Sequence, residues 1–264
     1  MGKTIGVISL KGGVGKTSSV VALGAAFSEL GKKVLLVDGN LSSPSLGLHL
    51  NIINPETTLH HVLERSVHAK DAIHELEMFD VIPSSIFWKK EVSPLILKDR
   101  IKYLKKKYDV ILLDSSPSLD EETLAVILAS DEVIVVTTPD HPTLSASIKA
   151  AKLAKQRGTP ISGIIINRVY GKDFEISLPD VEETLEIPVL AVIPHDVEVV
   201  RALSNMEPVV FSKPESKGSV EYKKLAAALS GEKYRTRSIK DFFKKLTPSR
   251  QEINREIFYK NVFG

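Results

Sequence analysis

The stretch that most constrains this chain runs from Lys11 to Thr17 and reads K-G-G-V-G-K-T. It follows the apolar run 5–8 and precedes residues 18–30, which have the composition of a helix. A strand, a glycine-rich turn and a helix start in this order predict a loop that binds phosphate groups. The glycines allow backbone N–H groups to converge on phosphate oxygens, and the positive end of the helix dipole points to the same place.

This loop also predicts the ligands of a nucleotide and its metal ion. Lys16 is long enough to reach the β- and γ-phosphates, and the hydroxyl of Thr17 is placed to bind Mg²⁺. We therefore expect ATP or ADP together with Mg²⁺ as cofactors. The residues expected around the phosphates are Gly12, Gly13, Val14, Gly15, Lys16, Thr17 and Ser18.

Composition excludes several other classes of protein. None of the 264 residues is a cysteine, which rules out structural disulfides, thiolate zinc sites and cysteine-bound iron–sulfur clusters. No apolar run approaches the length of about 18 residues that a membrane-spanning helix needs. Because the first apolar run begins within a few residues of Met1, we expect no signal peptide and a cytoplasmic protein.

Continuous apolar runs recur along the chain with helix-like segments between them. Because these runs lack the alternation of polar and apolar residues, each is predicted to be a strand that is buried on both faces. A helix is expected from Pro142 to Gln156, and Gly31 and Gly158 are expected to end helices. This order predicts an α/β fold, a doubly wound and mostly parallel sheet flanked by helices. The predicted strands, besides residues 5–8, are 34–37, 110–113, 133–136, 161–166 and 189–193.

Two of these strands end in aspartates, Asp38 after residues 34–37 and Asp114 after residues 110–113. The carboxyl ends of parallel strands form the edge at which α/β sheets bind ligands. A carboxylate there can hold Mg²⁺ directly or through water. We therefore expect Thr17, Asp38 and Asp114 to form the metal site.

A second lysine, Lys11, begins the phosphate-binding loop, while Leu10 stands where the general pattern has a glycine. With Lys11 included, the loop resembles the deviant Walker A loop of the MinD/ParA family of P-loop ATPases, and of its MinD-like members most closely. The resemblance covers residues 1–231. It implies a P-loop NTPase fold, with Asp114 as the Walker B residue and Asp38 as the first aspartate of switch I.

The resemblance also implies catalytic roles for Lys11, Lys16, Asp38 and Asn40. In the family, the lysine at the position of Lys11 crosses a dimer interface to the partner's phosphates, so an ATP-dependent homodimer is expected. The family usually has a second aspartate two residues after the first, where this chain has Asn40. An asparagine orients water but cannot accept its proton. We therefore expect an ATPase with slow hydrolysis and a long-lived ATP-bound state.

The base of the nucleotide is expected near two further segments. Asn167 follows the predicted strand 161–166, and in the family this position recognises adenine. Pro194 and Asp196 flank a loop that resembles a second base-contacting segment, in which His195 is expected to face solvent. An asparagine at this place also suits a turn or a helix cap, so this alternative stays open for Asn167.

The character of the chain changes near Gly231. Residues 232–264 carry nine Lys and Arg against four Asp and Glu, whereas the first 231 residues have a net charge of −3. We therefore predict an ATPase domain over residues 1–231 and a basic helical tail over residues 232–264. Four apolar residues of the tail share one helical stripe at i, i+3, i+4 and i+7, which suits a surface. They are Ile239, Phe242, Phe243 and Leu246.

Three surfaces fit this stripe: an anionic membrane, a partner protein, or the chain's own ATPase domain. Pro248 is expected at the first position of a further helix. The leading hypothesis for function is a MinD-like ATP-driven dimerisation switch that positions a partner, peripheral at the inner face of the membrane. The alternatives are a ParA-like ATPase that binds DNA, which the acidic body disfavours, and a nucleotide-gated adaptor with little turnover.

Overall fold

The computed structural model describes residues 2–234 and 248–263. Its centre is an eight-stranded sheet in the order β3-β4-β2-β5-β1-β6-β7-β8. All neighbouring strands are parallel except β3 and β4. The strands are β1 (Lys3–Ile8), β2 (Val34–Asp38), β3 (His74–Glu75), β4 (Asp80–Ile82), β5 (Val110–Asp114), β6 (Glu132–Thr137), β7 (Ile161–Val169) and β8 (Val189–Pro194).

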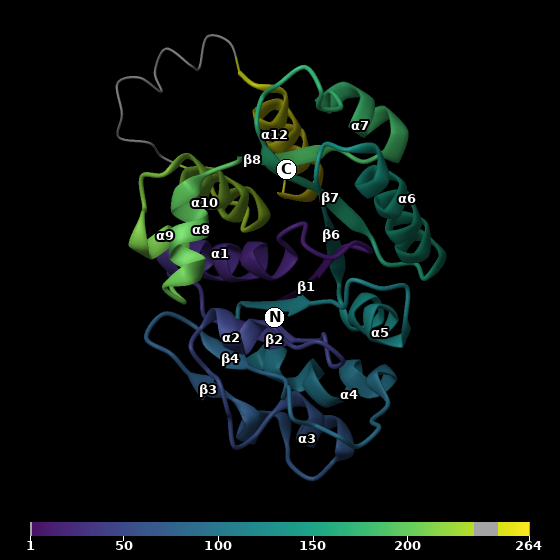
Figure 1. The fold of residues 1–264 in the computed structure, drawn as a ribbon, viewed down its shortest axis with the longest axis vertical. Helices are drawn as coiled ribbons and strands as arrows, with labels where there is room; N and C mark the ends of the chain where they lie inside the picture. Colours follow the sequence, from purple (N-terminus) through teal and green to yellow (C-terminus); the bar gives the residue numbers. More distant parts are fainter. Residues whose placement is uncertain (1, 235–247, 264) are drawn as a thin grey trace.

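Helices cover both faces of this sheet, as Figure 1 shows: α1, α8, α9 and α10 pack on one face, and α4, α5, α6 and α7 pack on the other. Apolar side chains of the central strands enter the core on both sides, which explains their continuous apolar sequences. The helices are α1 (Lys16–Glu29), α2 (Leu46–His49), α3 (Leu59–Glu64), α4 (Leu97–Ile101), α5 (Glu121–Ala129), α6 (His141–Gln156), α7 (Leu178–Leu185), α8 (Val197–Ser204), α9 (Val209–Ser212), α10 (Lys217–Leu229) and α12 (Arg250–Phe263).

The doubly wound, mostly parallel sheet predicted from the sequence is confirmed. Every predicted strand is present, each extended by one to three residues. Gly31 and Gly158 both follow helix ends and have φ of +74° and +73°, as a glycine C-cap requires. Helix α6 begins at His141, one residue before the expected Pro142. The short strands β3 and β4 escaped prediction because two or three residues carry too little periodicity.

The carboxyl ends of β1, β2 and β5 meet at one edge of the sheet. Val7 of β1 and Asp38 of β2 both pair in register with Asp114 of β5. The first residues of the phosphate-binding loop therefore emerge beside two buried carboxylates, and the chain order changes direction around β1. This is the crevice in which doubly wound sheets bind ligands.

Helix α12 packs against α10 and against β8, which is the outermost strand of the sheet. Asn254 Nδ2 donates to the carbonyl of Val189 at 2.8 Å, and Arg255 Nη1 donates to the carbonyl of Leu190 at 3.0 Å. Arg255 also pairs with Glu221 of α10 at 3.0 Å and is only 7% exposed. These side chains satisfy polar groups that an uncovered edge strand would present to other chains.

The start of α12 differs from the sequence prediction. The helix begins at Arg250 rather than at Pro248, because Glu252 accepts hydrogen bonds from both the backbone N–H and the hydroxyl of Ser249. The predicted stripe formed by Ile239, Phe242, Phe243 and Leu246 lies outside the described residues. In the described part of the chain, no helix combines the length and the apolar character that a membrane crossing needs.

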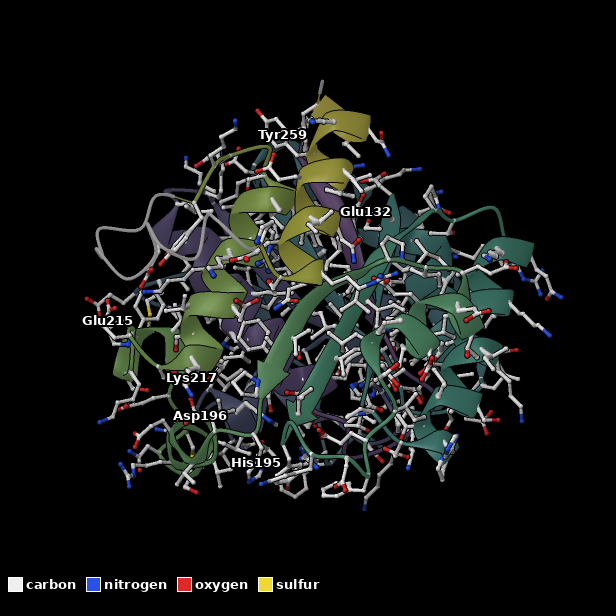
Figure 2. All side chains as sticks on the ribbon, turned by 90° about the horizontal axis from the view of Figure 1, so that it is seen from above. Glu132, His195, Asp196, Glu215, Lys217 and Tyr259 are labelled. Atoms are coloured by element: carbon white, nitrogen blue, oxygen red, sulfur yellow. The ribbon has the colours of Figure 1, made fainter. Side chains whose placement is uncertain are left out.

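Figure 2 shows where α12 lies relative to the ligand-binding edge. Tyr259 of α12 is at one end of this view, and His195 and Asp196, which follow β8, are at the opposite end. The residues after β8 belong to the carboxyl edge of the sheet, where the phosphate-binding loop also lies. Helix α12 therefore leaves this edge open to a nucleotide and to other chains.

Candidate functional site

The N-terminus of α1 is free of any capping side chain. Its cap residue is Gly15, with no side-chain hydrogen bond and no acidic residue in the first turn. Side chains cap five other helices, so their first N–H groups are already partly satisfied. Those caps are Asp120, Asp140, Ser177, Asp196 and Ser216. The uncapped N–H groups and the dipole of α1 are thus available to an anion that binds in the loop.

Gly15 is required at its position for two reasons. Its φ is +90°, which an L residue with a side chain adopts only with strain. A Cβ built there would lie 2.2 Å from Nδ2 of Asn167. That nitrogen donates to the carbonyl of Val14 at 2.8 Å, and Oδ1 of Asn167 accepts from the N–H of Arg168 at 2.9 Å. Asn167 therefore braces the phosphate-binding loop from β7, and its adenine-binding role stays a prediction.

Lys16 and Thr17 meet the same carboxylate, at the end of β5. Lys16 Nζ lies 3.2 Å from Oδ1 of Asp114, and the Thr17 hydroxyl donates to Oδ2 at 2.6 Å. All three side chains are buried: Lys16 and Thr17 are 8% and 9% exposed, and Asp114 is fully buried. A charged lysine held in such a place is oriented toward the loop in front of it, where phosphates would lie.

Asp38 lies beside Asp114 and is held by backbone N–H groups. Its carboxylate accepts from Ser45 and Leu46 at 3.2 and 3.0 Å, and from Asn40 at 3.3 Å. Burial, with the negative charge of Asp114 added, raises the pKa of Asp38 to about 8, although the N–H groups of Leu46 and Asn40 and the charge of Lys16 oppose the shift. A cation between the two carboxylates would remove this repulsion.

The residues present fit a magnesium ion. Thr17, Asp38 and Asp114 offer one hydroxyl and two carboxylates, all of them hard oxygen donors. Within the described ranges, no group of three or more His, Cys, Asp and Glu side chains forms a complete metal cage. Such a partial set is what Mg²⁺ uses beside a nucleotide, because phosphate oxygens and water complete its six ligands.

Asn40 is 5% exposed and forms part of the same edge. Its Nδ2 donates to the carbonyl of Ser43 at 2.6 Å, which fixes the carboxamide. Its Oδ1 is buried and has no hydrogen-bond partner among the described residues. A buried acceptor without a partner is costly, so a water or another donor bound at this site would find a partner in Asn40.

Lys11 lies at the open side of the loop, with its side chain 42% exposed. Its Nζ donates to Thr143 Oγ1 at 2.8 Å and pairs with Asp140 Oδ1 at 3.3 Å. Burial opposes ionisation of Asp140, but hydrogen bonds from Thr138, Thr143 and Lys11 outweigh it and lower the pKa to about 2. These residues line a cavity of about 380 Å³ between the phosphate loop and the residues after β7.

The second predicted base-contacting segment lies at the end of β8. Pro194 pairs with Val169 in the sheet, and Asp196 caps α8 by accepting from the N–H of Glu198 at 2.9 Å. The ring of His195 stacks on Tyr170 with centroids 4.5 Å apart. Pro194 and Asp196 therefore share the carboxyl edge with the phosphate-binding loop, and their contact with a base stays a prediction.

Two residues at this edge were missed from the sequence. Ser45 lies 2.9 Å from the Thr17 hydroxyl and donates its N–H to Asp38. Glu122, in the first turn of α5, accepts hydrogen bonds from the backbone of the loop that follows β2. Burial, together with the charge of Asp120, raises the pKa of Glu122. The acidic run Asp120–Glu122 is visible in the sequence, but it looks like an ordinary helix start.

Comparisons with known proteins agree with this geometry. A family model described as an AAA domain matches residues 2–155. An uncharacterized ATP-binding protein of Methanocaldococcus jannaschii is 32% identical over 237 residues, which cover 89% of this chain and 90% of that protein. The septum site-determining protein MinD of Thermotoga maritima is 30% identical over 269 residues, which cover 93% of this chain and 99% of that protein.

Among solved structures, MinD of Pyrococcus horikoshii in complex with Mg-ADP superposes with a TM-score of 0.83. The two chains are 34% identical, and the match covers 87% of this chain and 96% of the other. The similarity therefore extends over most of this chain and nearly all of the other.

The Gly15→Ala substitution is expected to destabilise the protein even without a nucleotide. The positive φ and the contact with Asn167 together should lower the free energy of unfolding by about 2 kcal/mol. Gly12→Ala is the matched control, since a Cβ at Gly12 meets nothing within 4 Å. It should change the free energy of unfolding by less than about 0.5 kcal/mol. Urea denaturation of the nucleotide-free variants checks this, and equal stabilities would contradict it.

Proposed function

The chain belongs to the MinD/ParA family of P-loop ATPases, and from that premise we propose that it is an ATP-driven dimerisation switch that positions a partner molecule or complex in the cell. The observation that carries the proposal is the placement of Lys11. Its ammonium group lies at the open edge of the phosphate-binding loop rather than inside it. A second copy of the chain facing this edge would bring its own phosphates toward Lys11.

The contact that holds Lys11 in the single chain is weak enough to exchange. Both Lys11 and Asp140 have side chains more than 40% exposed, and exposed ion pairs contribute about 1 kcal/mol or less. A hydrogen bond from an ammonium group to a phosphate is stronger, because both partners are charged. Lys11 would therefore move from Asp140 to a partner's nucleotide when ATP is bound, which couples dimerisation to nucleotide state.

We further propose that ATP is hydrolysed slowly. Asn40 occupies the position where the family usually has a second aspartate, and its Oδ1 is a buried acceptor with no partner among the described residues. That oxygen can accept a hydrogen bond from the attacking water, but it cannot take a proton. In a loose phosphoryl-transfer transition state, positioning contributes more than proton abstraction, so turnover is retained at a low rate.

The proposed docking segment is the stripe of Ile239, Phe242, Phe243 and Leu246, on an anionic membrane surface or on a partner protein. Its two flanks are attached to the ATPase domain, since α10 precedes it and α12 is bound to β8. Two such segments in an ATP-bound dimer would act together, so their joint affinity exceeds that of one. The proposal therefore includes a cytoplasmic protein that binds the inner face of the membrane when it is dimeric.

Binding to DNA is the weaker alternative. Two basic runs could form a DNA-binding surface, Lys89–Lys90 and Lys105–Lys107. Three of their five lysines are paired with carboxylates. Lys105 lies 2.7 Å from Asp131, Lys107 lies 3.8 Å from Asp80, and Lys90 lies 2.5 Å from Glu64. Pairing lowers the positive potential on which non-specific DNA binding depends. The other alternative, a nucleotide-gated adaptor with little turnover, differs from the main proposal only in its rate of ATP hydrolysis.

Removing the charge of Lys11 should uncouple ATP from dimerisation. We expect Lys11→Ala to weaken the Mg·ATP-dependent dimer by about tenfold to a hundredfold, through loss of a charged hydrogen bond. Analytical ultracentrifugation with Mg·ATP measures this. Lys155→Ala is the control, because it removes an exposed lysine from the other end of α6. An unchanged dimer in Lys11→Ala would refute the role of this lysine.

Restoring an aspartate at position 40 should speed hydrolysis. Asn40→Asp supplies a proton acceptor beside the bound water, and we expect kcat to rise by about tenfold or more. Phosphate release under saturating Mg·ATP measures this, and Asn40→Ala should lower kcat instead. A rate in Asn40→Asp at or below that of the wild type would show that Asn40 does not limit turnover.

The docking segment is best tested by point substitutions. Deleting residues 232–264 would also remove α12 and uncover the edge of β8. Phe242→Ser combined with Phe243→Ser should reduce co-sedimentation with anionic phosphatidylglycerol vesicles in Mg·ATP by about tenfold or more, because each buried phenylalanine contributes about 1.5–3 kcal/mol. Ile257→Ser, at a side chain that is exposed on α12, is the control.

The same sedimentation assay separates the alternatives. Wild-type protein that sediments with duplex DNA but not with vesicles would favour the DNA-binding function. Wild-type protein that sediments with neither would place the stripe on a protein partner or on the ATPase domain. Equal sedimentation of the wild type and the double variant with vesicles would exclude the stripe as the membrane contact.

A further inference from the structure

A carboxylate on α5 holds the loop that carries Asn40. Glu122 accepts hydrogen bonds from the N–H of Leu41 at 2.9 Å and from the N–H of Ser42 at 3.0 Å. The hydroxyl of Ser42 also donates a hydrogen bond to this carboxylate, at 3.4 Å. Two backbone donors on one ionised group make a charge-assisted contact, which is stronger than a neutral hydrogen bond.

This contact fixes the backbone on one side of Asn40, and Asp38 fixes it on the other. The N–H of Asn40 donates to Asp38 at 3.3 Å, and the next two N–H groups donate to Glu122. The carboxamide of Asn40 is itself tied to Ser43 at 2.6 Å. The buried Oδ1 of Asn40 therefore has little freedom to move while Glu122 holds the two residues that follow, Leu41 and Ser42.

The same helix also holds the loop that follows β5. Asp120 accepts from the hydroxyl of Ser116 at 2.7 Å and caps α5 by accepting from Thr123. Gly39 fits between the two loops: its N–H donates to the carbonyl of Asp114 at 2.8 Å, and a Cβ there would lie 2.7 Å from Val126 of α5. The first turn of α5 thus sets the spacing between the Asp38 loop and the Asp114 loop.

We propose that Glu122 is a positioning residue for ATP hydrolysis, which holds Leu41 and Ser42 so that the carboxamide of Asn40 faces the attacking water. This inference rests on the proposed ATPase function. Glu122 binds Leu41 and Ser42, and it would act on the reacting water only through the Asn40 loop. Its effect is therefore on the rate of the chemical step and not on nucleotide binding, which depends on the phosphate loop.

The fluorescence of a nearby tryptophan can report a movement of the loop that carries Asn40. Trp88 is the only tryptophan, and its ring stacks on that of His60 with centroids 5.2 Å apart. The backbone of Leu41 lies close enough to the His60 ring to oppose the lowering of the His60 pKa that burial causes. Leu41 therefore lies between Glu122 and the ring that stacks on Trp88, so a movement of the loop reaches the surroundings of Trp88.

The test compares two neighbouring acidic residues in one helical turn. Glu122→Ala should lower kcat for ATP hydrolysis by about tenfold to a hundredfold, as expected for a displaced catalytic group. The KM for ATP and the affinity for ADP should stay within about twofold of the wild type. Glu121→Ala is the matched control, because Glu121 is exposed and makes none of the loop contacts. Glu122→Gln, which keeps one acceptor oxygen, should give an intermediate kcat.

Several results would overturn the proposal. These are an unchanged kcat in Glu122→Ala, an equal fall in Glu121→Ala, or a rise in KM without a fall in kcat. Trp88 fluorescence of the nucleotide-free protein tests the contact separately from hydrolysis. Glu122→Ala should change the emission, whereas Glu121→Ala should not. If the wild type shows no turnover, the proposed hydrolysis fails, and unchanged Trp88 emission in Glu122→Ala would then refute the loop contact as well.

Discussion

The position of Asp114 at the end of β5 is the constraint on which the site depends. Its carboxylate is fully buried, binds Lys16 and Thr17 of the phosphate loop, and lies in register with Asp38. Burial, and after it the negative charge of Asp114, raises the pKa of Asp38 to about 8. Lys16 offsets part of this charge, and the oxygen donors around it suit Mg²⁺. The two buried carboxylates and the single lysine therefore leave an excess of negative charge at the edge where a nucleotide and its metal ion would bind.

Packing at this edge connects the expected nucleotide site to several segments of the chain. Asn167 of β7 supports the phosphate loop, and α5 holds the loops after β2 and β5 through Glu122 and Asp120. Lys11 lies outside this network, on an exchangeable contact with Asp140. The proposed switch follows from this contrast, because the interior of the site is fixed while its outer cation is available to a second copy. Helix α12 packs on the edge strand β8, at the far end of the molecule from the residues that follow β8 (Figure 2).

Sequence patterns predicted the sheet, and the strand, loop and helix around residues 11–17, because both depend on local signals. Buried strands are continuous apolar runs, and the loop from Lys11 to Thr17 has a fixed spacing of glycines and lysine. Contacts between distant segments were not predictable in this way. Glu122 and Leu41 are 81 residues apart, and Asn167 and Val14 are 153 residues apart. Arg255 looks like a surface residue in the sequence, yet it is buried against β8 because it satisfies a strand carbonyl.

Calorimetric titration of the protein with ADP, in the presence and absence of Mg²⁺, tests the role of Asp114 most directly. The wild type should bind ADP more tightly with Mg²⁺ by about tenfold or more, since metal and phosphate neutralise the buried carboxylates together. In Asp114→Asn, confirmed as folded by circular dichroism, the affinity for ADP should be nearly the same with and without Mg²⁺. An Asp114→Asn variant that keeps the full Mg²⁺ dependence of the wild type would contradict this account of the site.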